Sequence, residues 1–302
     1  MVSVSILGQS GVYAQQISDG NVPVIEMIGK AELTNYWDIG TVNDPDFRYE
    51  LHDLFELIKN DLHFPDRQVC IVIPHEWLHY YVVPVDNTLS VDEQRSYLEW
   101  EFDQRVGSDP IELFPRFYPL RTGQTTQEIL TIGLPENLLP YLQKATDAVH
   151  LQVETISIAP MALQHLLTGK SDITYFCRFT DKHAEVIQFT GQQFQGSGLF
   201  RLTEDMVAQL VRSSHGNSVT AELQSVLTDC LQGDINADVS IYGSTIPEQI
   251  QNLMSENGAV NYVNPFQGFK VNFRDGEVVQ LQEESQYAEV VGVLHDMMKD
   301  AT

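Results

Sequence analysis

Positively charged residues are scarce in this sequence. Its 302 residues contain 17 lysines and arginines against 42 aspartates and glutamates, which gives a formal net charge of −25 at pH 7. A protein that binds nucleic acid neutralises phosphates with lysine and arginine, and adhesion to anionic lipid needs the same side chains. The composition therefore argues against nucleic acid as a partner and against direct contact with a membrane surface.

Cysteine and long apolar runs are also in short supply. The three cysteines, Cys70, Cys177 and Cys230, are far apart and odd in number, which fits a reducing compartment better than a disulfide framework or a CxxC metal site. No stretch approaches the roughly 18 consecutive apolar residues of a membrane span, and the amino terminus lacks a basic segment followed by an apolar one. We therefore expect a soluble, unexported, cytoplasmic protein without a membrane-inserted segment.

Apolar residues are plentiful enough to build a core. They make up 43% of the chain, and a chain of this length usually divides into two lobes. Three strand-like segments come first: SVSILG, GVYAQQI and VPVIEMIG. A helix predicted over 49–60 follows, and then the unbroken apolar strand QVCIVIP. The second half repeats this order with three strands, two predicted helices and a strand: DITYFCRF, HAEVIQF, QQFQGSGLFRL, TEDMVAQLVRSS, TAELQSVLTDCL and ADVSIYG. We therefore predict two like lobes of β-β-β-α-β order.

The first half carries an additional α/β unit, expected over about 86–156. Ser90 followed by Glu93 forms a capping box at the start of a helix, and two strands, a helix over about 135–149 and another strand follow. We place the first lobe at 1–168, including this insert, and the second lobe at 169–302. A closing helix over about 286–299 could pack back on the first lobe.

Several segments with their order and spacing carry a resemblance to a known family. They are VCIVIPHEWLHYYVVPV, SVDEQRSYLEWEF, TIGLPENLLPYLQKATDAVHLQVETISIAPMAL, VSIYGSTIPEQIQNLMSENGAVNYVNPF and SQYAEVVGVLHDMM. Together with the duplicated lobes, they resemble the PilM and FtsA branch of the actin-like ATPase superfamily, in which the PilM members serve pilus assembly and competence. The resemblance implies an α/β (α+β), duplicated actin-like, ribonuclease H-like fold. Its first lobe would carry the small insert, and its second a reduced outer subdomain of about two helices.

The resemblance also implies a nucleotide site built from three loops, of which the first is only partly kept. Gly8, Gln9, Ser10 and Gly11 supply the backbone N–H groups and the hydroxyl that such a loop needs near phosphate. Ile6 stands where the family has an aspartate that organises Mg²⁺. This loop is a remnant that lacks its metal-organising group.

The other two loops are altered as well. Cys177 and Phe179 replace the aspartate and glycine of the second loop, and the third keeps Gly243 but has Ser244 in place of its second glycine. We therefore expect a degenerate ATPase with no catalytic residue, no metal site and no cofactor, in which these loops are remnants. The alternative is an active actin-like ATPase that binds ATP and Mg²⁺ through divergent loops.

The segment His75-Glu76-Trp77-Leu78-His79 matches the HExxH zinc motif. That motif requires a helix, which places both histidines on one face. The flanks of this segment are strand-like, and in an extended chain the two histidines would be about 13 Å apart. We expect a hairpin between buried strands, and keep a zinc hydrolase as a distant alternative.

Aromatic residues alternate on strands of the insert and its neighbour: Phe114, Phe117, Tyr118, Tyr80 and Tyr81. They could form core, or they could line a groove that accepts an extended or helical peptide. The second interpretation gains weight from the resemblance, since PilM is held by a cytoplasmic tail of an inner-membrane partner, PilN. The resemblance thus implies a non-hydrolysing scaffold that docks a PilN-like tail at the inner membrane, and it leaves room for an oligomer.

Overall fold

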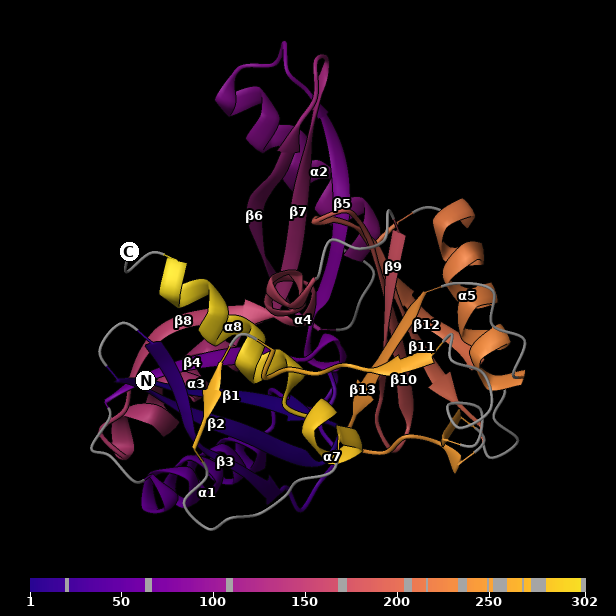
Figure 1. Cartoon of the computed structure of the whole chain (residues 1–302). Coiled ribbons are helices and arrows are strands. Elements are labelled where there is room, and N and C mark those ends of the chain that lie inside the picture. The colour runs from indigo at the N-terminus through magenta and orange to yellow at the C-terminus, as the bar shows by residue number, and fades with distance from the viewer. Residues whose placement is uncertain are drawn as a thin grey trace.

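The chain forms three β-sheets with helices packed on them (Figure 1). This computed structural model describes residues 1–19, 22–62, 67–106, 111–167, 173–203, 208–215, 217–232, 238–248, 250–251, 260–267, 269–272 and 281–299. Two six-stranded sheets form the bodies of two lobes, and a three-stranded sheet projects away from them (Figure 1). None of the described helices has the length and apolar content of a membrane span.

The first sheet has the strand order β15-β3-β2-β1-β4-β8. Its strands are β1 (Val2–Leu7), β2 (Ser10–Asp19), β3 (Val22–Glu32), β4 (Gln68–Ile73), β8 (Gln152–Ile158) and β15 (Lys270–Val271). The central strand β1 pairs antiparallel with β2 and parallel with β4. Strand β4 is buried after its first residue, as its unbroken apolar run predicts.

Helices cover both faces of the first sheet: α1 (Pro45–Asp61), α3 (Leu138–Ala148), α4 (Ala159–Leu163), the 3₁₀ turn η2 (Gln164–Leu166) and α8 (Ala288–Lys299). Helix α1 begins where Asp44 accepts a hydrogen bond from the Asp46 amide (2.9 Å) and Pro45 fixes the first helical residue. Side chains of β1 alternate between the faces, so Val4 joins the core with α1 and Leu7 packs with α8.

The second sheet has the strand order β12-β11-β10-β9-β13-β14. Its strands are β9 (Ile173–Phe179), β10 (His183–Thr190), β11 (Gln193–Leu202), β12 (Ala208–Ser213), β13 (Val239–Gly243) and β14 (Val260–Tyr262). Five of them, in the order β11-β10-β9-β13-β14, repeat the order β3-β2-β1-β4-β8 of the first sheet. The predicted duplication is confirmed at the level of strand connectivity.

Helix α5 (Asn217–Gln232) packs on the second sheet, and a short helix α7 (Leu281–Ser285) precedes α8. The prediction of a helix over 203–214 was wrong, because Ala208–Ser213 pairs antiparallel with β11 as strand β12. The apolar residues of this segment fit either element, and the pairing with β11 decides between them. The expected two helices between β11 and β13 are therefore one strand and one helix in the part that the structure describes.

The three-stranded sheet has the order β5-β7-β6. Its strands are β5 (His79–Asp86), β6 (Leu113–Thr122) and β7 (Thr126–Pro135), and α2 (Val91–Val106) packs on one face. The predicted capping box is confirmed: the Ser90 amide donates to Glu93 Oε2 (2.8 Å), and the Glu93 amide donates to Ser90 Oγ (3.4 Å). Tyr81, Leu98 and Phe102 form the core of this unit.

Candidate functional site

Two of the predicted loop residues lie against the turn between β9 and β10. Gly8 has a φ of +66°, and a Cβ added there would lie 3.1 Å from the Cβ of Thr180. Gly243 has a φ of +138°, and a Cβ there would lie 1.9 Å from the carbonyl oxygen of Phe179. Both positions therefore need glycine because of close contacts within the chain. The structure thus brings the first and third predicted loops to the second one.

The remaining predicted loop residues make contacts within their own lobe or with this turn. The Gln9 carbonyl accepts a hydrogen bond from the Leu33 amide (2.6 Å), and Ser10 Oγ donates to Glu32 Oε2 (3.0 Å). A Cβ on Gly11 would lie 2.6 Å from the side chain of Leu54. The Ser244 amide donates to the Phe179 carbonyl (3.0 Å), while its buried hydroxyl has no hydrogen-bond partner in the described part of the chain. A nucleotide-binding role for Gly8, Gln9, Ser10, Gly11, Gly243 and Ser244 stays a prediction.

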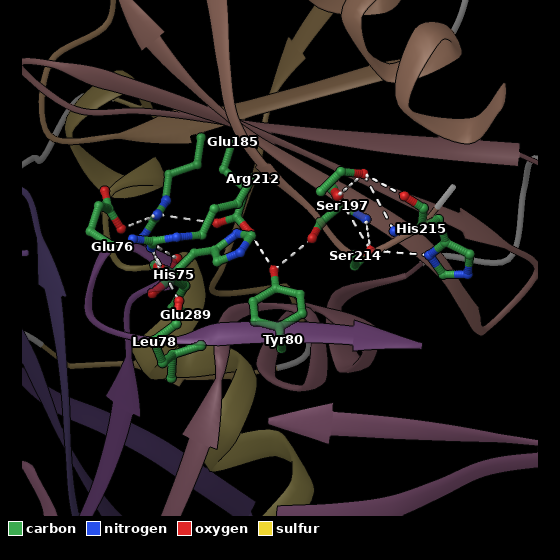
Figure 2. Close-up of polar contacts among 12 residues, drawn as sticks. His75, Glu76, Leu78, Tyr80, Glu185, Ser197, Arg212, Ser214, His215 and Glu289 are labelled. Atoms are coloured by element: carbon green, nitrogen blue, oxygen red, sulfur yellow. Dashed lines mark hydrogen bonds and ion pairs between the residues drawn. The ribbon is translucent and has the colours of Figure 1, made fainter. Parts of the chain in front are cut away.

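A fully buried charged cluster lies beside this turn, and sequence reasoning missed it. Its centre is Arg178 on β9, whose side chain is 1% exposed. Arg178 Nη2 lies 2.5 Å from Glu76 Oε2 and 3.1 Å from Glu185 Oε2, and Arg178 Nη1 lies 3.7 Å from Glu289 Oε1. The three carboxylates can be followed in Figure 2. We call these four residues the Arg178 cluster.

Hydrogen bonds extend the cluster on two sides. Glu185 Oε1 lies 2.9 Å from His75 Nδ1 and accepts a hydrogen bond from the Tyr80 hydroxyl, which in turn accepts one from Ser197 Oγ (2.8 Å) (Figure 2). Glu289 accepts hydrogen bonds from the Tyr242 hydroxyl (2.9 Å) and from the Ser5 hydroxyl. Glu185 and Glu289 are thus held by neutral donors besides the arginine. Glu76 relies on Arg178, and its Oε1 has no hydrogen-bond partner in the described part of the chain.

The electrostatics of the cluster shift the pKa values of its two innermost acids in opposite directions. Burial raises the pKa of the Glu289 carboxyl, and the Arg178 guanidinium offsets this only in part. Burial acts in the same direction on Glu185, but the charges of Arg178 and His75 outweigh it and hold the pKa of that carboxyl below its ordinary value. Burial works to lower the pKa of Arg178, yet the three carboxylates raise it well above the ordinary value. The surroundings therefore stabilise the charged forms of Arg178 and Glu185, while the balance at Glu289 shifts toward its neutral form.

The HExxH match supplies one member of this cluster, Glu76, and the neighbouring His75 contacts another member, Glu185. His75 and Glu76 lie in a 3₁₀ turn, η1 (His75–Trp77), where the Glu76 carboxylate pairs with Arg178. The expected hairpin was wrong, because β4 belongs to the first sheet and β5 to the three-stranded sheet. Among the described residues, the one His/acid grouping close enough to share a metal is His52, Asp53 and Glu56 on α1, and all three are at least partly exposed.

A second candidate site is an apolar groove of about 560 Å³ between the three-stranded sheet and the first lobe. Its lining comes from β6, β7, β8, α3 and α4, and from the residues on either side of η1 (Ile73, Leu78, Arg116, Tyr118, Pro119, Leu120, Leu130, Ile132, Leu134, Leu139, Ile156, Ser157, Ile158 and Met161). Arg116 is the one charged residue of this lining. Apolar grooves of this volume with few polar groups are typical binding sites.

Two sheet edges border the groove. Strand β6 is an outer strand of the three-stranded sheet, and β8 is an outer strand of the first sheet in the described part of the chain. An outer strand presents backbone N–H and C=O groups to whatever lies beside it. The groove therefore offers both apolar side chains and backbone hydrogen-bonding groups.

The aromatic residues singled out in the sequence divide between core and surface. Tyr81 and Phe117 pack in the core of the three-stranded sheet with α2, and Tyr80 belongs to the buried hydrogen-bond chain. Tyr118 is 51% exposed and lines the groove, and Phe114 is 42% exposed on the same strand. The core interpretation thus holds for three of the five, and Tyr118 fits the groove interpretation.

Comparisons with known proteins find similarity in structure. No protein-family model matches the chain, and no curated protein matches it. A chain of the PilM-PilN type IV pilus biogenesis complex is similar with a TM-score of 0.72 at 15% identity, over 98% of both chains.

Two further solved structures match with lower scores. The cytoplasmic domain of EpsL, an inner-membrane component of the type II secretion system of Vibrio cholerae, has a TM-score of 0.44 at 10% identity, over 98% of this chain and 94% of that one. A protein of actin-like ATPase fold from Bacteroides thetaiotaomicron has a TM-score of 0.43 at 10% identity, over 99% of this chain and 95% of that one. The repeated strand order and the match to the PilM-PilN structure confirm the predicted fold: the chain has the duplicated actin-like fold, in the form found in that pilus complex.

Proposed function

We propose that the chain is a non-hydrolysing scaffold that binds an apolar, extended segment of a partner protein in the groove between β6 and β8. The observation that carries the proposal is the groove itself, an apolar channel of about 560 Å³ with a strand edge on each side. An extended peptide beside such an edge gains main-chain hydrogen bonds, and its alternate side chains enter the apolar channel. Tyr118 and Ile156 supply exposed apolar contact area on the two opposite strands.

The similarity to the PilM-PilN complex supports a partner of a particular kind. That solved structure is a complex of type IV pilus biogenesis, and its fold is shared over nearly the whole of this chain. We infer that the partner is a PilN-like inner-membrane protein whose cytoplasmic tail enters the groove. The protein would then act in the cytoplasm, at the membrane surface through its partner.

The loops support a scaffold more than an ATPase. Ile6, Cys177 and Phe179 stand where the actin-like family has metal-organising or flexible loop residues, and Gly8 and Gly243 serve close contacts within the chain. Hydrolysis of ATP needs a positioned Mg²⁺ and charge stabilisation at the transferred phosphate. The competing proposal is an active ATPase, whose ligand would be ATP with Mg²⁺.

A peptide-binding experiment tests the groove. The probes are fluorescent overlapping peptides that cover the cytoplasmic tails of PilN-like proteins, titrated with the full chain and followed by anisotropy. We expect Ile156→Glu to weaken binding at least about tenfold, because it places a charge in the apolar channel. The matched control is Ile173→Glu, since Ile173 has a similar exposure (44% against 40%) but lies outside the groove on β9. Equal affinity in both variants would refute the groove.

A further inference from the structure

The Arg178 cluster joins parts of the chain that belong to different sheets. Arg178 and Glu185 lie on the adjacent strands β9 and β10 of the second sheet. Glu76 follows β4 of the first sheet, and Glu289 lies on α8, which packs on that sheet. One guanidinium on the second lobe therefore holds carboxylates that belong to the first lobe and its covering helix.

We propose that the Arg178 cluster is a built-in latch that fixes the two lobes relative to each other without a nucleotide. The resemblance to actin-like ATPases places a nucleotide between the lobes, where its phosphates and metal contact loops from both. Here Phe179 and Thr180, directly after Arg178, fill the space at Gly243 and Gly8 with protein atoms. The fixed charge that bridges the lobes is thus supplied by the chain.

The charges of the cluster suit this role. Three buried carboxylates around one position would repel each other, and a divalent cation or an arginine can bridge them. The Arg178 side chain, which is 1% exposed, supplies that positive charge from the second lobe. Its partners Glu76 and Glu289 have side chains that are 3% and 0% exposed, and they belong to the first lobe and its covering helix. Attraction between a buried arginine and buried carboxylates is screened little by salt. The link should therefore persist at physiological ionic strength.

Neighbouring hydrogen bonds tie strand β5 and the segment that precedes it to the second lobe in the same region. Arg212 Nη1 on β12 donates to the carbonyl oxygens of His75 and Leu78 (3.2 Å each). The Val82 amide on β5 donates to the Ser214 carbonyl (2.9 Å). His75 stacks on Tyr80, with ring centroids 4.0 Å apart. The latch is therefore the buried centre of a wider contact that includes all three sheets (Figure 2).

The distance between the lobes measures the latch directly. The native cysteines Cys70, Cys177 and Cys230 are buried, so spin labels on Asn60→Cys in α1 and Ser225→Cys in α5, both exposed positions, report the lobe separation by pulsed electron resonance. We expect one narrow distance distribution for the otherwise unchanged chain, with and without millimolar ATP and Mg²⁺. Arg178→Met should broaden it or add a second, longer distance, because three carboxylates then lack their cation.

A second variant and a control keep the result decisive. Glu76→Gln keeps the shape of the side chain and removes one interlobe charge pair, so it should produce the same change in smaller degree even if Arg178→Met does not fold. Arg95→Met, which removes an exposed arginine paired with Glu99 within α2, should leave the distribution unchanged. A distribution that shifts on addition of ATP, or one that stays narrow in Glu76→Gln and in any folded Arg178→Met, would overturn the latch. Peptide binding is not part of this readout, so the proposed function can fail separately.

Discussion

At the scale of single residues, backbone strain and buried charge decide which positions tolerate no change. Gly243 combines a φ of +138° with a Cβ position already filled by the Phe179 carbonyl, whereas Gly191 has a φ of +59° and open space. Arg178, Glu185 and Glu289 are buried together, so each of these side chains depends on the others. Neither feature is visible in the composition, and both can be tested by single substitutions.

Gly243→Ala should destabilise the fold strongly. The added methyl group must displace the backbone at Phe179 in addition to the strain of a positive φ, so we expect a loss of about 3 kcal/mol or more in unfolding free energy. Gly191→Ala has only the conformational cost, roughly 1 kcal/mol. Urea denaturation of both variants measures the difference. Equal losses would mean that the contact with Phe179 contributes nothing.

Glu289→Gln should change how stability depends on pH. Because the pKa of Glu289 is raised in the folded state, the folded chain binds a proton more tightly there than the unfolded chain does. That proton stabilises the fold increasingly as the pH is lowered from the raised pKa toward the ordinary value of 4.5. Glutamine mimics the protonated form, so the variant should lose this part of the pH dependence and remain folded at neutral pH. Urea midpoints between pH 5 and 8 measure it, and an unchanged slope would contradict the assignment.

The pKa of Glu185 is shifted in the opposite direction to that of Glu289, so its effect on stability changes with pH in the opposite sense. Since the pKa of Glu185 is lowered in the folded state, its contribution is complete above the ordinary value of 4.5 and is lost as the pH falls through the lowered pKa. Glu185→Gln should therefore destabilise most at neutral pH, and the difference from the parent should shrink on acidification. Urea midpoints measure it when the series is extended below pH 4.5, through the range of the lowered pKa. A difference that grows in acid would be evidence against a charged Glu185.

At the scale of helices and strands, local signals explain what could be predicted. The run QVCIVIP marked the buried strand β4, and Ser90 with Glu93 marked the start of α2. The prediction of a helix over Ala208–Ser213 was wrong because six residues of mixed polarity fit the periodicity of a helix and of a strand equally well. The pairing with β11 that decides between them is not visible in the local sequence. The turn at His75 was misread for the same reason, since its flanking strands join different sheets.

Ser90→Ala tests the capping box as an element boundary. Loss of the hydroxyl leaves the Glu93 amide without its acceptor, so we expect α2 to fray at its first turn and stability to fall by about 1 kcal/mol. Thermal unfolding of this variant measures the cost. The exposed Ser225 within α5 offers a control, because Ser225→Ala changes no cap and should be neutral or slightly stabilising.

At the scale of the whole molecule, the duplicated architecture was predictable and the candidate site was only partly so. The repeated order of elements and the segments similar to the family led to two like lobes, as the strand orders confirm. The Arg178 cluster was missed because its four members are spread over more than half of the chain and meet only after folding. A charged residue inside the apolar run YFCRF was its single local signal. The lobe boundaries stay a prediction.

Millimolar ATP with Mg²⁺ should leave the melting temperature unchanged. A ligand at 100 times its dissociation constant stabilises the fold by about 2.7 kcal/mol, which a thermal-shift assay detects easily. The expectation follows from the altered loops and from the protein atoms at Gly8 and Gly243. A rise in melting temperature together with phosphate release would favour the active ATPase.

The short segment between β4 and β5 belongs to both candidate sites. Ile73 and Leu78 line the groove, while His75 and Glu76, between them in the chain, belong to the Arg178 cluster or touch it. Any ligand that moves this turn is therefore thermodynamically linked to the lobe arrangement, and the linkage acts equally in both directions. A partner that prefers one lobe arrangement would be bound more tightly by a chain already held there, so the buried ion pairs set part of the affinity of a site that they never touch.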